Sequence, residues 1–232
     1  MTNLSGNQRG QYVQAMFARI APHYDRMNRL MTAGQDVRWR QEAIHRTALP
    51  PGGRLLDLGA GTGDLAAEAL RQFPGSQVVA ADFTLEMMQA GRATREADLA
   101  WSGADALHLP FPNQTFAAVV SGYLLRNVGD LSQALCEQHR VLQPGGRLVA
   151  LDTTRPPKGF LSPFINFHLH TVIPALGRLL AGESEAYTYL PDSTQEFLSA
   201  EQLATRLVQA GFRQVGFRRL MFGTMAIHWG VK

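Results

Sequence analysis

The chain has 232 residues, of which 45% are hydrophobic and 18% charged, which suits one globular domain and excludes an intrinsically disordered chain. Lys and Arg number 22 against 19 Asp and Glu, and without a basic block this balance gives no argument for a nucleic-acid partner. The single cysteine, Cys136, excludes an intrachain disulfide and favours a reducing compartment, and its helical segment predicts a small core residue.

The N-terminal region is predicted to be helical. Residues 1–13 contain no apolar signal-peptide core, so we expect a cytoplasmic protein. Residues 11–49 carry apolar and aromatic side chains in a helical and irregular pattern, and we expect residues 1–49 to form a helical cover. Tyr24 and Asn28 are candidates to cover a bound ligand, and the alternative is that they simply pack.

Strands and helices alternate over the next hundred residues. We expect strands at residues 54–58, 76–83, within 98–111, 115–125 and within 143–154. We expect helices at residues 63–73, 84–96 with Thr84 as N-cap, and 130–142. This alternation predicts a parallel sheet with right-handed crossovers. Because the strand cores are nearly continuous apolar runs, helices should cover both faces of that sheet.

The pattern breaks at residues 156–198, which we interpret as an apolar insertion over the ligand site of a single domain, 1–232. Residues 159–177 lack charge, but Pro163, Pro174 and Asn166 argue against a membrane span. The insertion suits a lipophilic tail, and it equally suits a lid or a homodimer surface. Beyond it, residues 199–212 read as a helix with a capping box, and strands at 213–222 and 224–231 predict an antiparallel hairpin.

The strongest motif is "LLDLGAGTGDLA", in which Gly59, Gly61 and Gly63 separate a strand from a helix. Glycines let a backbone approach a ligand, and the helix N-terminus offers free N–H groups. The dinucleotide pattern G-x-G-x-x-G fails from Gly59, because position 64 is Asp, and fits only from Gly61 with Ala66 in the last place. The glycines alone therefore do not identify the ligand.

The charges around this turn discriminate better. Asp57 ends the strand and Asp64 begins the helix, and two carboxylates suit a pyrophosphate poorly. They suit a ligand with a cationic amino-acid end, such as S-adenosylmethionine. The alternative for Asp57 is a solvated strand end.

Three further positions suit the nucleoside part of such a ligand. Asp82 can accept both ribose hydroxyls, and Phe83 can pack against the adenine. Asp105 and the backbone of Ala106 can bond the adenine amino group and ring nitrogen. The alternative for Asp82 and Asp105 is capping of a helix or turn.

These residues resemble a known family. "LLDLGAGTGDLA", "AADFTLEMM", "GADALHLPFPNQTFAAVV", "YLLRNVGDL" and "RVLQPGGRLVALD" are similar to class I S-adenosylmethionine-dependent methyltransferases. "MFARIAPHYDRMNRLMTAGQDVRWR", "VIPALGRLLAGESEAYTYLPDST" and "AIHWGVK" narrow the resemblance to the ubiquinone/menaquinone biosynthesis C-methyltransferases, over nearly the whole chain.

The resemblance implies an α/β fold of seven mostly parallel strands, the last one antiparallel, and S-adenosylmethionine as cofactor. It implies cofactor contacts at Thr62, Asp82, Asp105 and Ala106. Gly122 stands where the family often has serine, so contact there would use the backbone.

Two segments depart from the family's usual sequence. Its Phe-Gly-Leu-Arg-Asn is "YLLRN" here, residues 123–127, and its Leu-Glu-Phe-Ser is "LDTT", residues 151–154. Tyr123 and Leu124 lie where substrate should approach, so they bear on substrate choice.

The apolar run "AAVVSGYLL" ends abruptly in Arg126 and Asn127. Ligands of open parallel sheets sit at the carboxyl ends of the strands, which predicts that both residues face the substrate. We expect Arg126 to stabilise a substrate phenolate and Asn127 to orient it; a guanidinium cannot act as the base. The alternative for Arg126 is an ion pair with Asp130 or Asp152.

The resulting hypothesis is methyl transfer to a ring carbon of a prenylated quinol, demethylmenaquinol giving menaquinol. His168, with His170, is a candidate proton acceptor beside the substrate, and no metal site is expected. A lipophilic quinol suggests peripheral contact with the inner face of the membrane. The alternatives are another aromatic acceptor, a non-catalytic S-adenosylmethionine-binding protein, and a nicotinamide dehydrogenase.

Overall fold

The computed structural model describes residues 7–94, 99–156 and 193–232, together with positions 159, 163, 167 and 171–172. Most of the predicted insertion, including His168 and His170, lies outside these residues. Among the helices described, none is long and apolar enough to cross a membrane.

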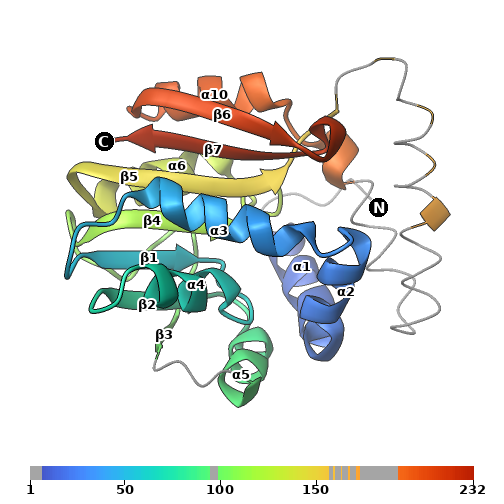
Figure 1. The fold of residues 1–232 in the computed structure, drawn as a ribbon, viewed down its shortest axis with the longest axis horizontal. Coiled ribbons are helices and arrows are strands. Elements are labelled where there is room, and N and C mark those ends of the chain that lie inside the picture. Colours follow the sequence, from blue (N-terminus) through green and yellow to red (C-terminus); the bar gives the residue numbers. More distant parts are fainter. Residues whose placement is uncertain are drawn as a thin grey trace.

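One seven-stranded sheet runs through the described domain in the order β3-β2-β1-β4-β5-β7-β6 (Figure 1). Its strands are β1 Arg54–Leu58, β2 Gln77–Asp82, β3 Ala100–Gly103, β4 Phe116–Gly122, β5 Leu142–Thr153, β6 Arg213–Leu220 and β7 Met225–Val231. Only β7 runs against its neighbours, pairing antiparallel with both β5 and β6. The predicted fold class and closing hairpin are confirmed.

Helices cover both faces of the sheet. α3 (Gln35–Thr47) and α4 (Asp64–Gln72) pack on one face, and α6 (Leu131–Val141) and α10 (Ala200–Gln209) on the other. Along β1, Leu55 joins the α3–α4 core while Leu56 and Leu58 join the α6–α10 core. Burial on both sides explains why the strand reads as continuous apolar sequence rather than as an alternation.

The N-terminal region is helical, as predicted. It comprises α1 (Asn7–Ile20), the 3-10 turn η1 (Ala21–His23), α2 (Tyr24–Met31) and α3. In Figure 1, α1, α2 and α5 (Leu85–Thr94) gather at the edge of the sheet where β1 and β2 end. Strands β2 and β3 extend the sheet on one side of β1, and β4 begins the other side. Such a switch point in strand order opens a crevice at the carboxyl ends of the strands.

Two local predictions have opposite outcomes. The capping box before α10 is present, because the Gln202 N–H donates to Ser199 Oγ and the Ser199 N–H to Gln202 Oε1. The prediction that Cys136 is a core residue is wrong, since it is exposed. The buried stripe of α6 runs through Ala134, Leu135 and Val141, and Cys136 projects away from it.

Candidate active site

A cavity of about 610 Å³ lies at the carboxyl ends of β1, β2 and β4. Helix α1 and Tyr24 form one side and three loops form the others. The walls comprise Gly10, Gln11, Val13, Gln14, Phe17, Tyr24, Leu58, Gly59, Gly61, Asp82–Thr84, Met87, Ala104–Leu107, Gly122–Leu124 and Asn127–Asp130. The lining combines backbone groups of the glycine loop, the carboxylates of Asp82 and Asp105 after β2 and β3, and several aromatic rings.

The glycine loop after β1 bends back over the end of β2. Gly59, Gly61 and Gly63 have φ of 68°, 56° and 83°, the left-handed region that side chains disfavour. The N–H groups of Gly59 and Ala60 both donate to Ala81 O. A Cβ on Gly59 would come within 2.9 Å of Leu124 Cδ1, so no side chain fits between this loop and the β4 loop.

Asp82 fixes the loop and faces the cavity at the same time. Its Oδ2 accepts the Gly61 N–H at 2.7 Å and its Oδ1 accepts the Thr84 N–H at 2.7 Å. Burial raises the pKa of this carboxyl, and its backbone hydrogen bonds oppose that rise. The capping alternative is thus present, and it holds the carboxylate where a ligand's hydroxyls could reach it.

The loop after β3 supplies the opposite wall. Asp105 Oδ1 accepts the Leu107 N–H at 2.9 Å, and Asp105, Ala106 and Leu107 all line the cavity. Phe83 is half exposed at its rim, and the Phe83 carbonyl accepts Gln14 Nε2 at 3.2 Å. The side chains chosen for the nucleoside are therefore gathered around one cavity.

Asp57, predicted to contact the ligand, does not line the cavity. It is fully buried, so the alternative of a solvated strand end is wrong. Its Oδ2 accepts the Ala66 N–H at 2.9 Å in the first turn of α4. Burial, with the charges of Asp82 and Asp64 adding to it, raises the Asp57 pKa from 3.8 to about 7.

Replacing Asp57 by Asn should flatten the pH dependence of stability. A raised carboxyl pKa means that the folded state retains a proton the unfolded state loses. Its contribution is full below about pH 4 and is lost as pH rises through about 7. At about pH 8 we expect the unfolding free energy of Asp57→Asn to exceed that of the parent by about 2–4 kcal/mol, because the variant has no buried charge at this position. The amide oxygen of Asn can still accept the Ala66 N–H. Urea unfolding of the parent and the variant at about pH 4 and about pH 8 measures this difference.

The matched control for that experiment is the exposed Glu196→Gln. It removes one carboxylate without changing a buried group, so its stability should follow the parent at every pH. Equal pH slopes for parent and Asp57→Asn would show that Asp57 ionises normally.

The end of β4 explains where Arg126 points. Tyr123 has φ of 58°, which ends the strand, and Arg126 turns back to β5. Arg126 Nη1 lies 2.7 Å from Asp152 Oδ1, and both side chains are buried. The alternative of an ion pair with Asp152 is therefore what the structure shows. Arg126 does not line the cavity; Asn127 does, and Asn127 Nδ2 donates to Tyr123 O at 2.9 Å.

Two tyrosine phenols form part of this wall. Tyr24 and Tyr123 line the cavity, and burial raises both pKa values. The charges of Arg126 and Arg40 act in the opposite direction on each phenol. Arg126 is also 5.4 Å from the Tyr123 ring centroid. The two buried arginines therefore offset part of the effect of burial on these phenols. Asn28, the other candidate to cover a ligand, is buried and does not line the cavity.

Two contacts between side chains of different elements were not predicted from the sequence. Arg40 Nη1 lies 2.7 Å from Asp36 Oδ2 and 2.5 Å from Asp64 Oδ2, which ties α3 to α4. The four-residue spacing of Asp36 and Arg40 predicts the first contact, but nothing local predicts the second. Thr62 Oγ1 donates to Asp25 Oδ1 at 2.7 Å and ties α2 to the glycine loop.

The described residues contain no group of three or more His, Cys, Asp or Glu able to hold a metal ion. The candidate substrate residue His168 lies outside them.

Comparison with known proteins agrees with this geometry. The model of the ubiE/COQ5 methyltransferase family matches residues 4–232. The ubiquinone/menaquinone biosynthesis C-methyltransferase UbiE of Desulfotalea psychrophila is 48% identical, over 97% of this chain and 92% of that protein. The demethylmenaquinone methyltransferase of Thermus thermophilus is 43% identical, over 93% and 99%. A solved SAM-dependent methyltransferase of Thermotoga maritima shares the fold, with a TM-score of 0.67 at 19% identity, over 94% and 98%.

Proposed function

Because the chain belongs to the ubiE/COQ5 methyltransferase family, we propose that it methylates a ring carbon of a prenylated quinol with S-adenosylmethionine, converting demethylmenaquinol to menaquinol. The observation that carries the proposal is the composition of one cavity. The side chains expected to bind a nucleoside line it together with the phenols of Tyr24 and Tyr123, and the charge of Arg126 acts to lower the pKa of both phenols.

The residues present fit S-adenosylmethionine. Asp82 would hold the ribose, Asp105 and Ala106 the adenine, and Phe83 would cover the ring. The backbone of Gly59, Gly61 and Gly122, which lines the cavity, would face the amino-acid part. Thr62 and Gly63 do not line the cavity, and Thr62 would act by holding the glycine loop against α2. When bound, this cofactor supplies an electrophilic methyl group on a sulfonium.

A ring carbon is a weak nucleophile unless a neighbouring phenol ionises. Ordinary phenols titrate near pH 10, so the site must favour the phenolate. Arg126 would do this by charge from behind the wall, just as its charge opposes the rise that burial causes in the Tyr24 pKa. Asn127, which lines the cavity, would orient the ring. Forming the carbon–methyl bond would break the sulfur–methyl bond and leave a neutral thioether. The ring carbon would lose its hydrogen, so the net reaction would release one proton to water.

Residues 156–198 would accommodate the prenyl tail, because they contain the uncharged and largely apolar stretch 159–177 and a quinol of this type resides in membranes. Transient attachment to the cytoplasmic membrane face follows from the same substrate. Flotation with lipid vesicles, with and without quinol, tests the attachment; complete absence from the lipid fraction in both cases would contradict it.

A second candidate is a different aromatic acceptor. It is favoured by Tyr123 and Leu124, which line the cavity and differ from the family's usual residues. Parallel turnover assays with a reduced short-tailed demethylmenaquinone, a demethylated benzoquinol and a tail-less phenol separate the two. We expect a methylene mass gain for the demethylmenaquinol. Product from the phenol alone would overturn the proposed substrate. Binding of NAD(P) in place of S-adenosylmethionine would overturn the reaction class.

A further inference from the structure

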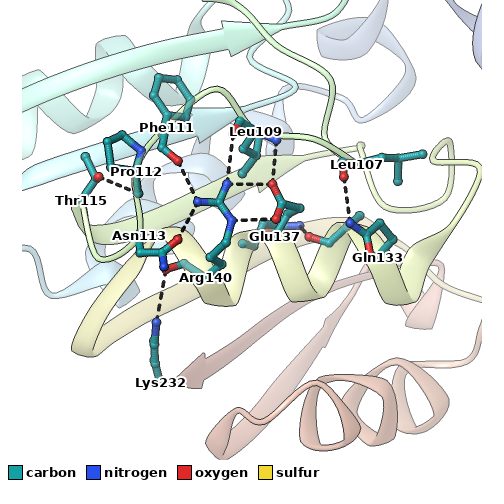
Figure 2. A network of polar contacts seen from close by, with 12 residues as sticks. Leu107, Leu109, Phe111, Pro112, Asn113, Thr115, Gln133, Glu137, Arg140 and Lys232 are labelled. Atoms are coloured by element: carbon teal, nitrogen blue, oxygen red, sulfur yellow. Dashed lines mark hydrogen bonds and ion pairs between the residues drawn. The ribbon is translucent and has the colours of Figure 1, made fainter.

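Side chains on one side of α6 hydrogen-bond to the loop of residues 104–115, which lines the part of the cavity where adenine is expected (Figure 2). Gln133 Nε2 donates to Leu107 O at 3.0 Å. The Leu109 N–H donates to Glu137 Oε2 at 2.7 Å, and Arg140 Nη2 donates to Leu109 O at 3.0 Å. Three side chains one helical turn apart thus bind consecutive parts of the loop backbone.

Arg140 also hydrogen-bonds to the part of the loop that leads into β4. Its Nη1 donates to Phe111 O at 2.8 Å and to Asn113 Oδ1 at 2.9 Å. Glu137 holds the guanidinium from the other side, with Nε–Oε1 at 2.7 Å and Nη2–Oε2 at 2.8 Å. This bidentate pair lowers the Glu137 pKa and raises the Arg140 pKa, as expected when both groups stay charged. The planar fork explains why one arginine can serve several acceptors.

The same loop reaches the cavity. Leu107, whose carbonyl Gln133 binds, lines the cavity next to Asp105 and Ala106. Neither Glu137 nor Arg140 lines the cavity. Their effect on a ligand must therefore pass through the loop backbone.

We infer that Gln133, Glu137 and Arg140 are positioning residues that set residues 105–107 against the adenine and so determine affinity for the cofactor. The inference rests on the proposed function, because it takes the ligand of this cavity to be S-adenosylmethionine. It assigns these residues no part in the chemistry at the methyl group.

The competing role is a purely structural clamp. The loop has apolar anchors of its own, since Leu109 is buried and the Phe111 ring meets Phe116 edge-to-face at 5.1 Å. These anchors should keep the loop folded when a polar contact is removed. Loss of the clamp should therefore shift residues 105–107 slightly rather than unfold them.

The test compares Arg140→Ala with Arg71→Ala. Arg71 makes the same kind of two-oxygen pair with a glutamate three residues earlier, Glu68, on α4, but the pair holds no loop. In the full-length protein, titration calorimetry measures the Kd of S-adenosylmethionine, and turnover at saturation measures kcat. Hydrogen exchange over residues 104–115 reports the loop directly.

We expect the Kd to rise about tenfold in Arg140→Ala, the size of one charge-assisted hydrogen bond, with kcat changed less than about twofold. Arg71→Ala should keep the parent Kd. Gln133→Ala, which removes a single neutral bond, should raise the Kd less and is the variant to use if Arg140→Ala does not fold. Arg140→Lys keeps the charge but not the fork, so it should recover only part of the affinity.

The outcomes separate the two proposals. A parent protein that binds no S-adenosylmethionine contradicts the proposed function. Tight binding by the parent with unchanged Kd in Arg140→Ala and Gln133→Ala contradicts the positioning role, even if thermal stability falls. A lower kcat at unchanged Kd also contradicts it.

Discussion

Arg126→Ala is expected to lower kcat by about 10²–10³-fold while leaving S-adenosylmethionine binding nearly intact, the usual size of one preorganised electrostatic contact. The same change should cost about 3–5 kcal/mol of unfolding free energy, because it leaves Asp152 charged, buried and unpaired. Loss of activity alone would therefore not distinguish catalysis from damage to the fold. Turnover, cofactor Kd and urea unfolding must be measured on one preparation.

The double variant Arg126→Ala with Asp152→Asn makes that distinction. It removes the unpaired charge, so stability should partly return while methyl transfer stays lost. Asp152→Asn alone keeps the guanidinium and should retain more activity than Arg126→Ala. If the double variant regained activity along with stability, the role of Arg126 would be structural only.

The second large effect is expected at Asp82. Replacing Asp82 by Ala should raise the S-adenosylmethionine Kd by about 10²-fold or more, because ribose contacts and the anchor on the glycine loop are lost together. Asp82→Asn keeps one acceptor oxygen, which can retain the Gly61 or the Thr84 N–H. It should therefore lose about tenfold. Calorimetry on both variants measures the effect.

Glu86→Gln is the control for Asp82, since Glu86 is an exposed carboxylate four residues along. Its Kd should match the parent. Unchanged binding in Asp82→Ala would show that this carboxylate only caps the loop and never meets the ligand.

The sheet was largely predictable because its signals are local. Pro-Gly turns, apolar strand cores and glycine-bounded helices repeat along the chain, and β1, β2 and β4 lie within a few residues of the predicted ranges. The Ser199–Gln202 capping box is likewise a pattern of four residues. The exposure of Cys136 was not predictable from hydrophobicity, because it depends on which face of the helix meets the sheet.

Many of the residues that line the cavity could be predicted from the sequence, but fewer of the ion pairs around it could. Strand ends located Asp82, Asp105 and Asn127 at one cavity. The partner of Arg126 required knowledge that β4 and β5 are neighbours, since Asp152 is 26 residues away. The contact between Arg40 and Asp64 depends in the same way on how α3 packs against α4. Charge pairs across elements are set by tertiary packing, which local sequence does not encode.

The most direct test of the central claim is to determine which atom of the quinol receives the methyl group. Purified protein is given S-adenosylmethionine with a deuterated methyl group and a reduced short-tailed demethylmenaquinone, and the product is examined by mass spectrometry and proton NMR. We predict a labelled methyl on the ring carbon next to the phenol, and loss of that ring hydrogen from the spectrum. Label on oxygen, or no labelled quinone from a protein that binds the cofactor, would contradict the account.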